Sequence, residues 1–309
     1  MKIKTFLAIL ILLILVSGCR LITPRRPEPS EPEKIEYRVG TKALEMSFLK
    51  NFPPDQIKAG REFQVLVEIK NQGAYDIDNL ILSLTGLLEQ TTKIIEEPEP
   101  IETLPGKSIN FPEGSKEIIS FKIRNEKRLP VDRHTELIKI DACYPYKTIA
   151  SADICINPTN QMVIPQTPKT CPQNQQIGLT GGQGAPIAVT RIEQTTTPTV
   201  IEQGIYELEL KFHISNLGTG TVFQEEGCKK GGILEIEDIS FHNYKLGSEI
   251  DCGFELGNQT LALEQRDNVL TCTANIYSAM GTFTTPSTIT LNYWYKDGIE
   301  KTIEILKAK

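Results

Sequence analysis

The chain has 309 residues, a length typical of about two domains of roughly 100–200 residues each. It carries 33 lysine and arginine residues against 39 aspartate and glutamate residues, for a net charge of −6. An acidic chain without a cluster of basic residues lacks the positive surface that nucleic-acid binding requires. We therefore expect no nucleic-acid partner.

Residues 1–18 have the pattern of a secretory signal peptide. Two lysines precede an apolar run from 6 to 16, and Ser17-Gly18 follow it. A basic start, a short apolar core and small residues before the cut describe such a signal. The run is shorter than the ~20 residues that cross a bilayer, so we expect cleavage rather than an uncleaved transmembrane anchor.

The segment Val16-Ser17-Gly18-Cys19 resembles the lipobox of prokaryotic lipoproteins. In that family the cysteine becomes the first residue of the mature chain and carries a diacylglycerol thioether. The resemblance implies that Cys19 is a lipid anchor and that the protein is held on the membrane at the cell surface, outside the cytoplasm. Two acyl chains would hold it firmly, whereas one chain gives only marginal membrane binding.

Two segments of the remaining chain have the composition of connections. Proline and charge dominate residues 19–38, which predicts an extended tether. A proline- and glycine-rich segment, 158–185, predicts a linker. These boundaries leave two predicted domains, 39–157 and 186–309.

Both predicted domains have the alternating pattern of half-buried β-strands. Apolar residues recur at every second position over 63–69 in the first domain and over 206–214 in the second. No amphipathic helical pattern of convincing length occurs in the mature chain. We therefore expect an all-β fold in which each domain is a β-sandwich.

Two landmarks recur in both predicted domains at nearly the same separation. Asn71-Gln72-Gly73 ends the first long strand, and Asn216-Leu217-Gly218 ends its counterpart. Tyr144-Pro145-Tyr146-Lys147 lies near the end of one domain, and Tyr293-Trp294-Tyr295-Lys296 lies near the end of the other. Asn-x-Gly is a turn device at a strand exit. The matched landmarks predict a tandem repeat.

These motifs resemble the immunoglobulin-like modules of archaeal and bacterial surface proteins, the CARDB and related groups. The resemblance covers residues 39–157 and 186–309 and implies two tandem immunoglobulin-like β-sandwich domains. The cysteines depart from the antibody pattern, because the strand that ends at Asn71 contains none. The chain is therefore expected to form sandwiches without the inter-sheet bridge of antibody domains.

Six cysteines remain besides Cys19, and an even number in an exported chain favours disulfides over free thiols. They are Cys143, Cys155, Cys171, Cys228, Cys252 and Cys272. We predict strands 137–144 and 149–156 as a hairpin with Cys143 and Cys155 on one outer face, which favours a bridge between them. Cys252 with Cys272 would join a long connection to a strand. Cys171 with Cys228 would pin the linker, although other pairings stay open.

The sequence offers no catalytic or metal-ligating constellation. His134, His213 and His242 lie in polar or charged surroundings, where a lone histidine is a surface residue far more often than a ligand or base. Prolines interrupt the acidic run 96–102. Such a run is typical of a solvated loop, because a calcium site needs oxygens that converge from one folded loop. No zinc spacing, nucleophile elbow or phosphate-binding loop occurs. We expect no enzyme activity, metal or cofactor.

Two further residues are candidates for contact or modification. Trp294, the only tryptophan, falls on the face opposite the apolar set Tyr293 and Tyr295. It could stack on a carbohydrate or anchor a partner, or it could be covered by a loop or by the predicted linker. Asn258 begins the single Asn-x-Ser/Thr glycosylation sequon.

These observations favour an exported, lipid-anchored cell-surface protein with a non-catalytic role in adhesion, envelope scaffolding or protein interaction. The expected partners are the membrane, through Cys19, and an unidentified surface protein or glycan. One alternative is a carbohydrate- or substrate-binding accessory lipoprotein of an envelope enzyme or transporter. A second alternative is a subunit of a surface filament.

Overall fold

The computed structural model describes residues 37–88, 91–125, 131–158, 172, 174–224, 226–229, 233–241, 250–253, 260–263, 267–277 and 282–307. Within these ranges the chain is β-strand and connecting loop with one short 3-10 helix, η1 (Ile201–Gln203), and the predicted all-β class is confirmed. None of the described residues belongs to a helix long and apolar enough to span a membrane. Four candidate residues lie outside the described ranges: Cys19, Cys171, His242 and Asn258.

One four-stranded antiparallel sheet is built from the first part of the chain. Its strand order is β1 (Leu44–Phe48), β3 (Glu62–Asn71), β7 (Lys116–Asn125) and β5 (Thr92–Glu96). β3 has the predicted alternation, because Val65, Val67 and Ile69 are fully buried while the residues between them are not. One face of this sheet therefore packs into the core.

A second four-stranded antiparallel sheet is built from the later part of the chain. Its order is β15 (Asp267–Tyr277), β11 (Ile205–Asn216), β10 (Ile187–Val200) and β9 (Asn174–Gly178). Phe212 and Ile214 of β11 are fully buried, as the alternation predicts. β9 lies within residues 158–185, where we expect a linker, and pairs with β10 as the edge strand.

The third sheet has eight strands and joins both parts of the chain. Its main path is β14 (Thr260–Ala262), β13 (Ile233–Phe241), β16 (Phe283–Leu306), β8 (Arg133–Ile156), β4 (Ile77–Thr85) and β6 (Ile101–Leu104). Two short strands also pair with β16, β12 (Thr221–Phe223) in antiparallel and β2 (Gln56–Lys58) in parallel orientation.

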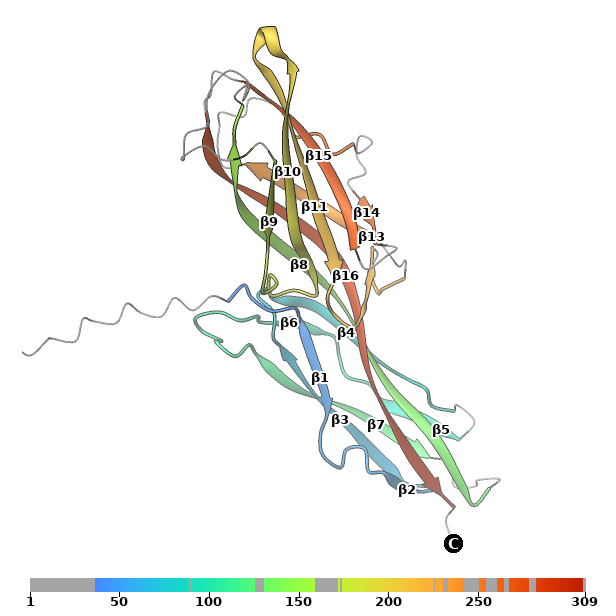
Figure 1. The fold of residues 1–309 in the computed structure, drawn as a ribbon. Coiled ribbons are helices and arrows are strands. Elements are labelled where there is room, and N and C mark those ends of the chain that lie inside the picture. The colour runs from blue at the N-terminus through green and yellow to red at the C-terminus, as the bar shows by residue number, and fades with distance from the viewer. Residues whose placement is uncertain are drawn as a thin grey trace, which may run out of the picture. The chain divides into compact units, whose positions relative to one another are not determined.

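β8 and β16 are the framework of the fold. They pair antiparallel from Ile156 opposite Phe283 to Arg133 opposite Leu306 without a shift in register, and Figure 1 shows them side by side along this length. β4 pairs with β8 at one end of the ribbon, where β2 also joins β16, and β13 pairs with β16 at the other end. Each long strand therefore contributes its two ends to different sets of neighbours.

The predicted hairpin of strands 137–144 and 149–156 is wrong, because both segments belong to the single strand β8. Every even-numbered residue from Glu136 to Ile156 is buried, so the alternation crosses 144–148 without changing phase. This segment also lacks the glycine and asparagine residues that a tight hairpin turn needs. The two tyrosines within it are held in the core instead of forming a turn.

The disulfides differ from the favoured pairing in the same region. Cys143 bonds to Cys228, with 6.0 Å between the Cα atoms, and not to Cys155. Cys143 and Cys155 lie about 40 Å apart along one strand at ~3.3 Å per residue, far beyond disulfide reach. The Cys171–Cys228 pairing is also wrong, because Cys228 is bonded to Cys143, whereas the structure confirms Cys252–Cys272. Cys155 is also disulfide-bonded.

Candidate binding site

Four buried tyrosines occupy the core face at the middle of the β8–β16 ribbon. Tyr144 lies opposite Tyr295, and Tyr146 lies opposite Tyr293. Neighbouring ring centroids are 6.0–6.4 Å apart, and most pairs meet edge to face, the arrangement that aromatic quadrupoles prefer. Burial raises the pKa of these hydroxyls, that of Tyr295 to about 12. The quartet therefore stays neutral and joins the two strands firmly.

The first Asn-x-Gly landmark is tied to this quartet through Tyr146. The Asn71 side chain donates to the carbonyls of Tyr75 (2.9 Å) and Leu104 (2.8 Å), and its Oδ1 accepts from Gly73 N. The Tyr146 hydroxyl accepts from Tyr75 N (3.2 Å) and donates to the Gly184 carbonyl (3.1 Å). A Cβ at Gly73 would collide with the Tyr146 hydroxyl, so only glycine fits.

The second landmark repeats the arrangement through Tyr295. Asn216 Oδ1 accepts from Gly218 N (3.1 Å) and from the Tyr295 hydroxyl (3.1 Å), while Asn216 Nδ2 donates to the Gly220 carbonyl. Gly220 N donates to the Tyr295 hydroxyl (2.8 Å). A Cβ at Gly218 would collide with that hydroxyl. The landmarks therefore match in their contacts as well as in their sequence.

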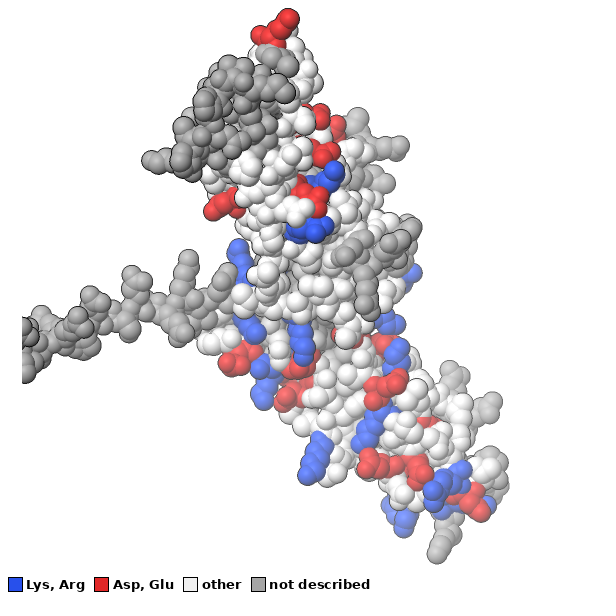
Figure 2. All heavy atoms as spheres, viewed as in Figure 1, with Lys and Arg blue, Asp and Glu red and all other residues white. Residues whose placement is uncertain are grey.

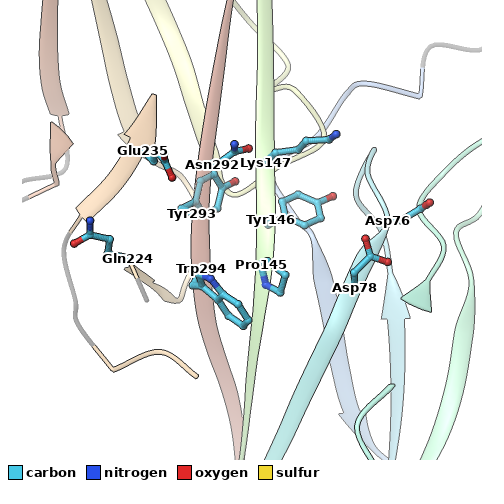
Figure 3. Close-up of a pocket in the computed structure, with 10 residues that line it drawn as sticks. All are labelled: Asp76, Asp78, Pro145, Tyr146, Lys147, Gln224, Glu235, Asn292, Tyr293 and Trp294. Atoms are coloured by element: carbon cyan, nitrogen blue, oxygen red, sulfur yellow. The ribbon is translucent and has the colours of Figure 1, made fainter. Parts of the chain in front are cut away.

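A cavity of about 260 Å³ lies at the middle of the ribbon, lined by Trp294 and Pro145 and also by two of the four tyrosines. At its floor, Trp294 of β16 lies opposite Pro145 of β8, and Phe223 of β12 pairs with Trp294 on the other side. Figure 3 shows Trp294 and Pro145 between two walls, one with Asp76 and Asp78 and the other with Gln224 and Glu235. The lining residues are Asp76, Asp78, Pro145, Tyr146, Lys147, Gln224, Glu235, Asn292, Tyr293 and Trp294.

Structural contacts hold several of the polar lining residues in place. Asp76 accepts from Gly106 N and Asp78 from the Thr103 hydroxyl, both at 2.8 Å. The Lys147 ammonium lies 5.5 Å from the centre of the Tyr75 ring. Side chains fixed in this way lose little freedom when a ligand binds.

The wall that contains Gln224 and Glu235 is supported by the Cys143–Cys228 disulfide. Cys143 is on β8, and Cys228 follows β12, so the bond ties the segment after β12 to the ribbon. Gln224 at the end of β12 is therefore held near the ribbon, and the exposed Glu235 stands on β13. Trp294 itself is half-buried. The cavity thus combines an accessible aromatic ring with carboxylate and amide groups.

The remaining predicted residues do not join this cavity. His213 lies 3.2 Å from Glu193 Oε1 and 3.2 Å from Arg191 Nη2 on the second sheet. His134 lies 3.7 Å from Glu136 on β8. The acidic run is divided between the end of β5, a connection and the start of β6. Among the described residues, no three His, Cys, Asp or Glu side chains are grouped to hold a metal ion.

Sequence reasoning missed the fully buried Glu136. It lies on the same strand face as Ile138 and Ile140, both fully buried. The alternation of β8 therefore places this carboxylate in the core, and extending the pattern by one step before Ile138 reveals it in the sequence.

No family model and no curated protein matches the chain. Among solved structures, it is similar to the secreted serine protease VesC from Vibrio cholerae, at 10% identity and a TM-score of 0.20. The match covers 80% of this chain and 48% of the protease chain, so this chain spans about half the length of that protein. A likeness this weak carries no argument about fold or activity.

Proposed function

We propose that the chain is an exported, lipid-anchored cell-surface protein in which two immunoglobulin-like β-sandwiches present a binding surface. The Cys143–Cys228 and Cys252–Cys272 disulfides support an oxidising compartment outside the cytoplasm. The lipobox-like segment supports attachment through Cys19. The proline-rich residues 19–38 would hold the sandwiches away from the membrane.

In this proposal the two sandwiches share β8 and β16 rather than following one another as separate beads. One half combines the β1–β3–β7–β5 sheet with β2, β4 and the ends of the long strands that pair with them. The other combines the β15–β11–β10–β9 sheet with β12, β13 and the opposite ends. The repeated Asn-x-Gly and tyrosine contacts support a relation between the halves.

The role that the geometry supports best is non-catalytic binding of a surface partner at the Trp294 cavity. The observation that carries this proposal is a half-buried indole at the floor of a cavity with carboxylate and amide walls. Tryptophan anchors in pockets supply much of the binding energy at protein interfaces. Paired long strands make the floor rigid, so little ordering is required on binding.

The surface charge agrees with a partner that is not a polyanion. On the face seen in Figure 2, acidic and basic side chains are interspersed, and neither sign forms a large continuous patch. This face therefore offers no large patch of one sign for long-range attraction of a charged partner.

Cross-linking on intact cells tests this function. Wild-type protein and the Trp294→Ala variant are treated with an amine-reactive cross-linker, and the attached partners are identified by mass spectrometry. Tyr277→Ala is the matched control, because Tyr277 is an exposed aromatic residue on β15 away from the cavity. We expect a partner that is retained by wild type and Tyr277→Ala and lost by Trp294→Ala. Equal partners for all three proteins would contradict the proposed site.

A carbohydrate is the second candidate ligand, and the same cavity favours it. An accessible indole can stack on a sugar ring, while Glu235 and Gln224 can accept from and donate to its hydroxyl groups. A glycan array probed with the full chain distinguishes the two candidates. Selective glycan binding that Trp294→Ala abolishes would favour the accessory-lipoprotein role. A cell-surface protein partner without glycan binding would favour adhesion or scaffolding.

A further inference from the structure

A second polar cluster lies between the first sheet and β8, and none of its residues lines the cavity. It consists of Thr91, Thr92, Asn125, His134 and Glu136. The Glu136 side chain is 0% exposed, and Thr92 and Asn125 are each 2% exposed. The binding function proposed above uses none of these groups.

The cluster is poorly satisfied as a purely structural network. Both threonine hydroxyls donate to the same oxygen, Glu136 Oε1, at 2.7 Å from Thr91 and 2.8 Å from Thr92. Glu136 Oε2, Asn125 Nδ2 and His134 Nε2 have no hydrogen-bond partner. A buried carboxylate with an unpartnered oxygen opposes folding, so stability alone does not explain this set of residues.

The cluster instead brings a threonine hydroxyl, a carboxylate and a side-chain amide next to one another. Thr92 on β5 lies directly opposite Asn125 on β7 in the strand register. Its hydroxyl faces two acceptors, Asn125 Oδ1 at 3.3 Å and Glu136 Oε1 at 2.8 Å, and so lies beside the amide whose Cγ is the electrophile. A hydroxyl held by an adjacent general base is the arrangement that activates serine and threonine nucleophiles.

We propose that the cluster forms an intramolecular ester cross-link between Thr92 and Asn125. Glu136 accepts the proton of the Thr92 hydroxyl as its oxygen bonds to Asn125 Cγ. The Cγ–Nδ2 bond then breaks, and Glu136 returns the proton to the leaving nitrogen, which departs as ammonia. The reaction is redox-neutral, needs no other reactant and leaves Glu136 unchanged.

Burial accounts for both the reaction and the persistence of its product. Low exposure places the hydroxyl against the carboxylate without competing water, which strengthens its activation. The same exclusion of water protects the ester from hydrolysis. The product would fasten β5, the edge strand of its sheet, covalently to β7, and edge strands are the part of a sheet most exposed to loss of pairing.

Thr91 provides an internal comparison. Its hydroxyl also donates to Glu136, at 2.7 Å, yet the residue that lies opposite Asn125 in the strand register is Thr92. We therefore assign Thr92 as the nucleophile and Thr91 as a residue that positions the carboxylate.

Peptide mapping of the full chain tests the proposal. Reduction and trypsin digestion separate Thr92, in peptide 71–93, from Asn125, in peptide 125–127. We expect the two peptides joined, with a mass about 17 Da below their sum for the ammonia lost. Thr92→Val and Glu136→Gln should abolish the joined species. Thr92→Ser, which keeps the hydroxyl, and Thr91→Val should retain it.

The wild-type protein alone is sufficient to overturn the proposal. If its two peptides appear separately and at full mass, the cluster forms no ester, whether or not the variants fold. A 17 Da loss confined to peptide 125–127 that persists in Thr92→Val would indicate cyclisation of Asn125 with its own backbone and would equally refute the cross-link. Neither result depends on whether a ligand binds at Trp294.

Discussion

Removing the hydroxyl of Tyr295 isolates the contribution of one repeated landmark. Tyr295→Phe keeps the ring that packs against Tyr144 at 6.1 Å and Tyr293 at 6.2 Å. It removes the acceptor of Gly220 N and one donor to Asn216 Oδ1. Asn216 Oδ1 keeps its bond from Gly218 N, so the main loss is one unpaired backbone N–H. That loss costs about 1–3 kcal/mol.

Thermal unfolding of the purified protein measures this effect. A loss of about 2 kcal/mol in a folded unit of this size lowers the Tm by roughly 4–8 °C. Tyr277→Phe is the control, because Tyr277 is 44% exposed and its hydroxyl should contribute little. If Tyr295→Phe melts at the same temperature as Tyr277→Phe, the tyrosine–turn contact does not stabilise the fold, and the reasoning fails.

Three other predictions follow from single groups. Gly218→Ala should destabilise the protein by about 1–3 kcal/mol in a urea titration, because the added Cβ overpacks against the Tyr295 hydroxyl. Gly178→Ala is the control, since its Cβ would meet nothing within 4 Å. Equal urea midpoints for the two variants would contradict the close approach of Gly218 to Tyr295. The pKa of Tyr295 is raised from 10.0 to about 12 by burial, so this hydroxyl ionises in the unfolded chain before it ionises in the folded one. The stability that the neutral hydroxyl contributes is therefore complete below pH 10 and is lost by about pH 12. Between these pH values the urea midpoint of Tyr295→Phe should fall less steeply than that of wild type, and identical slopes would argue against the raised pKa. Metabolic lipid labelling should disappear in Cys19→Ser, and labelling equal to wild type would falsify the anchor.

Local patterning predicts the strands well because burial repeats at every second residue. The alternation over 63–69 and 206–214 corresponds to β3 and β11. The alternation over 138–156 also continues across the turn that we predict between 144 and 149, and it specifies one long strand. The tyrosines at 144 and 146 decide against the turn, since both side chains are buried.

The cavity could be predicted only in part. The outward direction of Trp294 follows from its position between Tyr293 and Tyr295. The walls come from separate segments: Asp76 and Asp78 precede or begin β4, Gln224 follows β12, and Glu235 is on β13. Their meeting depends on the pairing of β8 with β16, a long-range contact that no local pattern encodes.

Site-specific photo-cross-linking from the cavity wall tests the central claim most directly. A photoreactive amino acid replaces Gln224, which lines the cavity, or Tyr277, which lies outside it, and intact cells carrying the full chain are irradiated. The account predicts a discrete cross-linked species from position 224 that disappears when Trp294→Ala is added, and no such species from position 277. Identical products from both positions, or a product from position 224 that Trp294→Ala leaves unchanged, would contradict a binding surface at Trp294.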